Sequence, residues 1–396
     1  MKLKSAIIIT SNSYPNGDAG AIRQHAMAKI LENLGYDSFV IGYGCTGKGI
    51  LGIYENIKFT SLRPVSNNKV IRIFARCFFG NSVMHYLRKA KLCPVLLIVV
   101  DVLPDTFRKI EKFAKKCGSI LIHDSVEWYS PEEFVNGKRN IEYLLKEYTN
   151  KKAIKEPWKV ISISTYLDSY FRSRGLESIR VPAIIDVQSM PFNSECNKNK
   201  IVFVYAGGPG RKDYLKEMIE GYVLLTDSQI KKSEFHIIGV KKDDLINICG
   251  VSEGTLNKLK NSLVAHGRLP RNSTLNWIRN ADFTVLLRNS ELRYAKAGFP
   301  TKVVESLSCG TPVICNLSSD LSMYLVNGVN ACLVRDHTPM SIHATFVEVL
   351  TMTEDSKMNM RKAARKTAEE SFDFRLYEET IKVLLRGNGM NHYRSR

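Results

Sequence analysis

Short apolar runs alternate with helix-period segments along this 396-residue chain, and this alternation constrains its fold more than any other feature. The segment Ala21–Leu34, for example, has the pattern of an amphipathic helix and ends at a glycine. Such alternation is typical of an α/β fold with parallel sheets. The expected strands are Ala6–Thr10, Ser38–Ile41, Val95–Val100, Ser119–His123, Val160–Ile163, Ile201–Tyr205, Glu234–Ile238, Phe283–Leu287, Pro312–Ile314 and Ala331–Val334.

The pattern starts twice, and each time the first strand is followed by a loop that contains glycine. Between the two halves, Ser189–Lys200 is polar and rich in turn-forming residues. We therefore expect two Rossmann-like domains of similar size with a linker between them, and a mobile tail at the end. The expected parts are an N-terminal domain over residues 1–190, a linker over 191–200, a C-terminal domain over 201–370, a C-terminal helix over 371–388 and a flexible tail over 389–396.

Size and composition exclude several classes of protein. A mass of 44.8 kDa is enough for two domains with their own cores, and no apolar run approaches the roughly 18 residues of a membrane span. The first apolar run is shorter than the roughly 7–15 residues of a signal peptide, which indicates the first strand of a cytoplasmic protein. Nine cysteines are scattered without a CxxC motif. We therefore predict reduced thiols and neither a disulfide framework nor a structural zinc site.

The segment Gly298–Asn316, GFPTKVVESLSCGTPVICN, predicts a loop, a short helix and a buried strand. Thr301 can cap the helix and Gly310 can end it. Lys302 then lies in the first turn, where free N–H groups and the helix dipole attract anions. Glu305, one turn further on, suits the two hydroxyls of a ribose, and phosphate beside ribose indicates a nucleotide. The alternative is that the lysine and the glutamate are an exposed helix pair.

A second glycine loop follows the expected strand Ile201–Tyr205 and precedes another helix. Gly207 and Gly208 allow the backbone to approach a ligand closely, and Arg211 and Lys212 add positive charge at the start of the helix. A turn whose basic residues face water is the alternative. Two such loops after strands of one domain are stronger evidence for phosphate binding than either loop alone.

These two loops resemble the donor site of retaining GT-B glycosyltransferases of family 4, which bind nucleotide sugars. In that family the second glutamate of an E-x7-E motif holds the ribose. Glu305 matches it, whereas Ala297 replaces the first glutamate, which helps to hold the donor sugar. Lys212 and Lys302 are then expected to bind the diphosphate and to act in catalysis. The other donor-binding residues implied by the resemblance are Gly207, Gly208, Arg211, Arg268, Arg288, Gly298, Phe299, Pro300 and Thr301.

The resemblance also implies two domains that face each other across a cleft, a last helix that crosses back to the first domain, and no metal ion or other cofactor. The loop after the first strand, PNGDAGAIR, does not have GxGxxG spacing, so a dinucleotide-binding fold fits poorly. It resembles the glycine-rich segment that lines the reaction centre in family 4. The acceptor-side residues implied there are Gly17, Asp18, Gly20 and Arg23.

His123 closes another expected strand, at the edge where α/β proteins bind ligands. The resemblance implies that it touches the donor sugar and takes part in catalysis, and the alternative is a hydrogen-bonded histidine at the rim of the sheet. Glu127 and Trp128 follow and are expected on the acceptor side. The indole could stack on a sugar ring or pack in the core.

The net charge of +18 is concentrated in the first half, and residues 51–100 hold eight basic residues and one acidic residue. Within residues 67–93, basic side chains interleave with Phe, Ile and Leu. This pattern favours binding to an anionic membrane surface. The alternative is a helix that packs its aromatic side chains into the first domain.

We interpret the chain as a glycosyltransferase that moves a sugar from a UDP- or GDP-sugar, with retention, to a growing, lipid-linked surface polysaccharide such as a capsule, O-antigen or exopolysaccharide. It would lie on the inner face of the cytoplasmic membrane. Two alternatives stay open. The alanine in the E-x7-E motif fits a sugar-nucleotide epimerase or a weakly active binding homologue, and the positive charge alone suggests a nucleic-acid-binding protein, although no recognition motif accompanies it.

Overall fold

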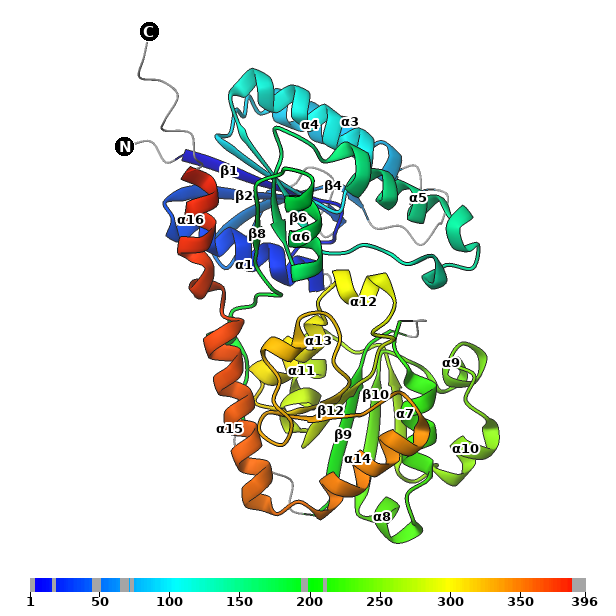
Figure 1. Ribbon diagram of the computed structural model, residues 1–396. Helices are drawn as coiled ribbons and strands as arrows, with labels where there is room; N and C mark the ends of the chain where they lie inside the picture. Colours follow the sequence, from blue (N-terminus) through cyan, green and yellow to red (C-terminus); the bar gives the residue numbers. More distant parts are fainter. Residues whose placement is uncertain are drawn as a thin grey trace. The chain divides into compact units, whose positions relative to one another are not determined.

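The computed structural model describes residues 4–15, 19–44, 51–64, 71, 75–193, 199–208 and 212–386. The chain forms two compact units (Figure 1). Unit 1 comprises Met1–Ile185 together with Phe374–Arg396, and unit 2 comprises Asp186–Asp373. Each unit has a central sheet of mostly parallel strands flanked by helices, which confirms the predicted α/β class. The strands predicted from the apolar runs are all present.

An eight-stranded sheet lies at the centre of unit 1, in the order β3-β4-β2-β1-β5-β6-β7-β8. β3 pairs with β4 in the antiparallel sense, and the other pairings are parallel. β5 is buried along its whole length, as expected for a strand with helices on both faces of its sheet. The strands are β1 (Lys4–Thr10), β2 (Tyr36–Gly44), β3 (Leu51–Tyr54), β4 (Ile57–Pro64), β5 (Leu96–Val100), β6 (Ile120–Ser125), β7 (Lys159–Ser162) and β8 (Ser178–Arg180).

The last helix of the chain belongs to the core of unit 1. Figure 1 shows α16, in red, beside α1, in blue. Ile381 and Leu384 of α16 are fully buried in the same cluster as Ile8 and Leu31. The main helices of unit 1 are α1 (Ala19–Asn33), α3 (Phe79–Lys89), α4 (Pro104–Cys117), α5 (Ile141–Tyr148), α6 (Thr165–Ser173) and α16 (Glu378–Arg386).

Residues 371–388 do not form the single helix that was predicted. α15 ends at Ser371, a 3-10 turn covers Phe374–Tyr377, and α16 begins only at Glu378. The chain passes from unit 2 back to unit 1 within this break, between Asp373 and Phe374.

Unit 2 has a six-stranded sheet in the order β11-β10-β9-β12-β13-β14, with every pairing parallel. The strand order reverses between β9 and β12, and ligands of such sheets bind at the carboxyl ends beside this switch point. The strands are β9 (Ile201–Ala206), β10 (Ser233–Ile238), β11 (Leu263–Gly267), β12 (Phe283–Leu286), β13 (Val313–Cys315) and β14 (Ala331–Leu333). The helices are α7 (Leu215–Val223), α8 (Asp227–Lys231), α9 (Lys242–Asn247), α10 (Glu253–Lys258), α11 (Arg271–Asn280), α12 (Arg293–Ala297), α13 (Thr301–Ser308), α14 (Pro339–Thr351) and α15 (Glu354–Ser371).

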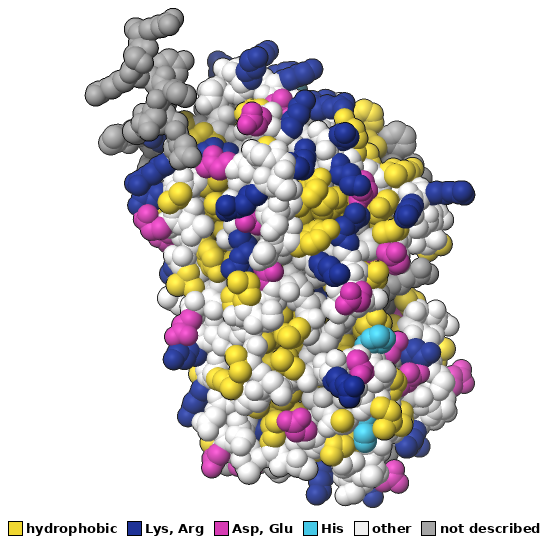
Figure 2. All heavy atoms as spheres, viewed as in Figure 1, with side chains coloured by type: hydrophobic (Ala, Val, Ile, Leu, Met, Phe, Trp, Pro, Cys, Tyr) yellow, Lys and Arg dark blue, Asp and Glu magenta, His cyan; other side chains and the backbone are white. Residues whose placement is uncertain are grey.

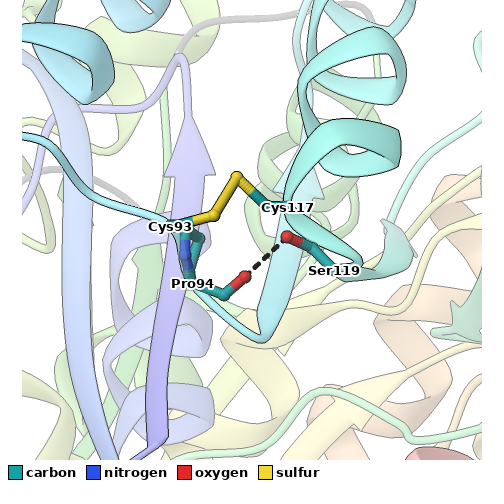
Figure 3. The surroundings of a disulfide bond; sticks show 4 residues. All are labelled: Cys93, Pro94, Cys117 and Ser119. Carbon is teal, nitrogen blue, oxygen red and sulfur yellow. Dashed lines mark hydrogen bonds between the residues drawn. A yellow bond between two sulfur atoms is a disulfide. The ribbon is translucent and has the colours of Figure 1, made fainter.

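The prediction of reduced thiols is wrong for one pair of cysteines. Cys93, just before β5, and Cys117, at the end of α4, form a disulfide with a Cα–Cα distance of 5.5 Å (Figure 3). The Ser119 hydroxyl beside it donates a hydrogen bond to the Pro94 carbonyl at 2.5 Å. The two cysteines are 24 residues apart in sequence, so their proximity comes from the fold rather than from a local motif. The free cysteines within the described ranges are Cys77, Cys249, Cys309, Cys315 and Cys332, and Cys45 and Cys196 lie outside those ranges.

No helix within the described part of the chain is long and apolar enough to cross a membrane.

Candidate functional site

The predicted donor residues of unit 2 converge at the switch point of its sheet. β9 runs into the loop that holds Gly207 and Gly208, and β12 runs toward Arg288. Lys302 enters from the first turn of α13. A Cβ atom added to Gly207 would overlap the Lys302 ammonium, so the glycine is needed for this close approach. Gly239, at the end of β10, has φ +97°, and a Cβ there would overlap the Gly207 carbonyl.

Asp213 connects the cations of this site. Its carboxylate forms an ion pair with Lys302 Nζ and another with Arg288 Nε, the latter at 3.0 Å. The Tyr205 hydroxyl donates a hydrogen bond to Asp213 Oδ2 at 2.8 Å, and Lys302 Nζ lies 4.8 Å from the centre of the Tyr205 ring. The arrangement places an internal anion among groups that can bind a diphosphate.

Burial and charge oppose each other in this network. Burial acts to raise the pKa of the Asp213 carboxyl, but the Lys302 ammonium and the Arg288 guanidinium outweigh it and hold that pKa well below its usual range. Burial lowers the pKa of Lys302, while the Asp213 carboxylate opposes that shift. Asp213 and Lys302 are therefore both ionised, and each charge stabilises the other.

Glu305 lies one turn after Lys302 and is mostly buried, with 18% of its side chain exposed. It forms an ion pair with Arg271, the first residue of α11. Both Lys302 and Glu305 border a small cavity of about 20 Å³ beside Ala206. The two side chains therefore share a site with the carboxyl end of β9 and are not merely an exposed helix pair.

The start of α13 differs in detail from the prediction. Thr301 is the first helical residue and not the cap. Pro300 occupies the N-cap position and makes no side-chain capping hydrogen bond. Gly310 ends the segment with φ +70°, as predicted. Gly298 closes α12, and Phe299 is buried against an aromatic cluster with Tyr324 and Phe372. Phe299 therefore supports the loop through packing.

The other predicted donor residues have different environments. The Lys212 ammonium lies 5.7 Å from the centre of the Tyr294 ring, and the Tyr294 hydroxyl donates to the Lys212 carbonyl at 2.6 Å. Arg268 is exposed just after β11. Asn316 fixes the backbone of Arg288 through hydrogen bonds of 2.9 and 2.7 Å. Arg211 lies outside the described residues.

His123 does not lie at the rim of the sheet, so the prediction that it touches a sugar needs correction. β6 continues to Ser125, which leaves His123 between β5 and β7, fully buried. Its Nδ1 lies 3.2 Å from the Val99 carbonyl, and Nε2 is buried without a hydrogen-bond partner. Burial lowers the pKa of the imidazole to about 3. A neutral, enclosed imidazole cannot contact a ligand in this structure.

Arg23 is also a buried residue and not an open acceptor-side group. Its guanidinium forms an ion pair with Asp124 at 2.8 Å and donates to the Val181 and Pro182 carbonyls. These contacts tie α1 to β6 and to the segment just after β8 in unit 1. Gly20 lies in the first turn of α1, and Gly17 and Asp18 lie outside the described residues.

Trp128 packs within unit 1 instead of presenting its face for stacking on a sugar. The indole is buried and contacts the Tyr170 ring at a centroid distance of 4.5 Å. Its Nε1 donates to Glu147 at 2.6 Å. Glu127, the preceding residue, is partly exposed.

The basic segment 67–93 is described only in part. Residues 67–70 and 72–74 lie outside the described ranges. In α3, Phe79 and Leu87 are buried in unit 1, as the packing alternative predicts, whereas Arg88 and Lys89 are exposed. On the face shown in Figure 2, basic side chains interleave with hydrophobic ones over unit 1. Membrane association stays a prediction.

Comparison with known proteins gives the fold and the enzyme class. Residues 186–367 match the family model for glycosyl transferases group 1, and no curated protein matches the sequence significantly. Sucrose-phosphate synthase from Thermosynechococcus elongatus has 12% identity and a TM-score of 0.75, over 97% of this chain and 98% of that chain. HepE of Anabaena in complex with UDP-glucose has 13% identity and a TM-score of 0.64, over 95% and 98%. WaaG, a glycosyltransferase involved in lipopolysaccharide biosynthesis, has 12% identity and a TM-score of 0.70, over 96% and 100%.

These matches show that the chain has the fold of GT-B glycosyltransferases, and the family match together with this fold supports a glycosyltransferase enzyme. The matched region contains the whole switch-point site of unit 2. Sequence reasoning missed three of its members: Asp213, Arg271 and Asn316. Asp213 directly follows the predicted Lys212, but no local pattern signals that its carboxylate turns inward onto residues that are 75 or more positions away.

Proposed function

We propose that this chain transfers a sugar, with retention of configuration, from a UDP- or GDP-sugar to a growing, lipid-linked surface polysaccharide. The observation that carries the proposal is the Lys302 ammonium, which lies against the glycine loop at the switch point of unit 2, one turn before Glu305. HepE, which has the same fold, was solved in complex with UDP-glucose. WaaG, which also shares it, is involved in lipopolysaccharide biosynthesis.

The donor diphosphate would bind among Lys302, Arg288 and Lys212, beside the uncapped first turn of α13. These groups place positive charge where negative charge develops as the bond between sugar and diphosphate breaks. Glu305 would accept hydrogen bonds from the ribose hydroxyls. The acceptor hydroxyl would attack the sugar from the face that the diphosphate leaves. The departing phosphate oxygen can therefore take the proton of this hydroxyl, and no protein nucleophile is needed. We expect transfer to require no metal ion.

The acceptor would bind through unit 1 and be held near an anionic membrane by the basic surface of that unit. Arg88, Lys89 and Lys91 are exposed at the end of α3, and the half-exposed Phe78 precedes the start of this helix. Each basic residue close to such a surface contributes on the order of 1 kcal/mol to membrane binding. A lipid-linked acceptor is confined to the membrane, so this attraction would raise the local concentration of the enzyme around its substrate.

The first experiment is a calorimetric titration of the purified chain with UDP, GDP, ADP and CMP. We expect one base class to bind with a dissociation constant on the order of micromolar. Glu305→Ala should weaken that binding at least about tenfold, because the ribose loses its acceptor. Lys302→Ala should lower turnover more than nucleotide affinity, because its charge acts chiefly on the developing diphosphate.

Lys296→Ala is the matched control, because Lys296 lies in the same unit with 46% of its side chain exposed and forms an ion pair with the exposed Glu291. This variant should bind and turn over as the unchanged protein does. Binding of none of the four nucleotides would refute the donor site. An equal loss of turnover in Lys296→Ala would show that Lys302 has no special role.

A further inference from the structure

Unit 1 contains a cavity of about 520 Å³ that none of the assignments above uses. It lies between the start of α4 and the helix α5, and the loop after β5 forms its base. Its volume falls within the range of small-molecule sites, roughly 300–1,000 Å³. All the residues that line it belong to unit 1, so the cavity is separate from the switch-point site of unit 2.

Apolar side chains form most of the cavity wall. Leu103 and Pro104 come from the start of α4, and Ile141 and Leu145 from α5. Ile141 is 73% exposed, so the apolar wall continues out to the protein surface. A free sugar would leave many of its hydroxyls without hydrogen-bond partners against such walls. An apolar chain fits them better.

Among the described charged side chains around the cavity, Arg139 is a cation without an ion-pair partner. Arg76 pairs with Glu142 at 2.8 Å, and Lys146 pairs with Asp101 at 3.5 Å. Arg139 is exposed and has no ion-pair partner among the described residues. An unpaired guanidinium prefers a carboxylate or a phosphate, which it can bind through two parallel hydrogen bonds.

The start of α4 borders the same cavity but adds little to the preference for an anion. Pro104 has no N–H group to offer, and the first turn also holds Asp105, which pairs with Lys109. The preference for an anion therefore rests on the Arg139 guanidinium.

We propose that this cavity binds an amphiphilic phosphate, an alkyl or isoprenyl chain that ends in a phosphate group. Arg139 contacts the phosphate, and the chain lies along Leu103, Leu145 and Ile141 toward the surface. The proposed function gives this ligand its role as the lipid part of the acceptor. Binding itself needs no donor and can be measured separately from transfer.

The test is a calorimetric titration of the full chain with octyl phosphate below its micelle concentration. We expect one saturable site. Inorganic phosphate should bind at least about tenfold more weakly than octyl phosphate because it lacks the alkyl chain. Octyl glucoside should also bind at least about tenfold more weakly because it lacks the phosphate charge. Similar affinity for octyl glucoside would refute the role of Arg139, and similar affinity for inorganic phosphate would refute the apolar channel.

Two matched pairs of variants locate the site. Arg139→Ala should weaken octyl phosphate binding at least about tenfold, whereas Lys138→Ala, which removes the same charge from the neighbouring exposed residue outside the cavity, should not. Ile141→Ala should weaken octyl phosphate but not inorganic phosphate. Leu144→Ala is its control, since Leu144 is 50% exposed on the same helix and does not line the cavity.

Equal losses of octyl phosphate affinity in both variants of a pair would mean that the ligand adsorbs nonspecifically to the surface around α5. This outcome would overturn the cavity site. Absence of saturable binding at millimolar octyl phosphate would overturn it as well. Nucleotide binding by Arg139→Ala separates the two proposals. One result would be that Arg139→Ala binds UDP or GDP with unchanged affinity while no form of the protein binds octyl phosphate. This result would refute the cavity site and leave the proposed donor site unaffected.

Discussion

At the residue scale, Asp213 controls the charge of the switch-point site of unit 2. Its carboxylate pairs with Lys302 and Arg288, the cations that a diphosphate would use. Asp213→Asn keeps the size and the hydrogen-bonding oxygen but removes the competing negative charge. We expect it to bind the preferred nucleoside diphosphate roughly tenfold more tightly, measured by calorimetry. A loss of affinity would mean instead that Asp213 orients the lysine for the ligand.

The same substitution should lower stability. The Asp213 carboxylate is 6% exposed, and removing one partner of a buried pair costs roughly 3 kcal/mol. Because the pKa of Asp213 lies below its unfolded value, its contribution is complete above that unfolded value and is lost as the pH falls toward the folded pKa. Tighter ligand binding combined with lower stability is the outcome expected of a group that stabilises the free protein at a cost in ligand affinity.

His123 makes the stability of unit 1 depend on pH. Its pKa is about 3 when folded, against 6.5 for an ordinary histidine. Between these values the unfolded chain binds one more proton, so stability falls as the pH falls, by about 1.4 kcal/mol per pH unit. Urea unfolding between pH 4.5 and 6 should show this slope, and His123→Phe should reduce it. His85→Asn, which changes an exposed histidine of α3, should leave it unchanged, and an equal reduction there would contradict the assignment.

At the scale of elements, Arg361 fixes α15 to the rest of unit 2. It is 1% exposed, and its guanidinium donates to the carbonyls of Asn193, Arg279 and Ala281. Arg361→Met should destabilise unit 2 by roughly 3 kcal/mol, because three buried or partly buried carbonyls lose their donor. Lys362→Met, at the exposed neighbouring position, should change little in the same thermal unfolding experiment. Equal effects would show that the carbonyl contacts contribute nothing.

Two of the strands that sequence reasoning missed, β3 and β11, differ in burial from those that it found. β5 and most of β1 are buried on both faces, so they appear as continuous apolar runs. β3 and β11 lie at the edges of their sheets, and most of their residues are exposed or only partly buried, which leaves no such run. The glycine loops at the switch point could be predicted because strand, loop and helix follow one another directly in the sequence.

Contacts between distant residues could not be predicted in this way. His123 closes an apolar run, but β6 extends two residues beyond it and the neighbouring helices cover it. Whether His123 lies at the sheet edge or inside the sheet therefore depends on where β6 ends, and a short apolar run in the sequence does not determine that end. Arg23 appeared as part of a loop motif, yet its partner Asp124 is 101 residues away. Such pairings depend on the whole fold.

At the scale of the whole molecule, unit 1 consists of two separate stretches of chain. A chain that ends at Asp373 lacks Phe374, Ile381 and Leu384, all buried in the core of unit 1. We expect this truncation to destabilise unit 1 by roughly 5 kcal/mol, since each buried large apolar side chain contributes about 1.5–3 kcal/mol. Limited proteolysis should then cut unit 1 first, while nucleotide binding by unit 2 persists.

A chain that ends at Arg386 is the control for this truncation, because it keeps α16 and loses only residues outside the described ranges. It should resist protease as the full chain does. Equal sensitivity of the two truncated chains would show that α16 is not needed for the core of unit 1.

The return of the chain to unit 1 also sets an order of events during protein synthesis. Residues leave the ribosome from the first to the last, so all of Asp186–Asp373 emerges before α16 does. Unit 2, although encoded later, is the first to have every residue that it needs, and domains generally fold as units while they are made. Until then the nascent unit 1 exposes the apolar side chains that pack in one cluster with Ile381 and Leu384 of α16.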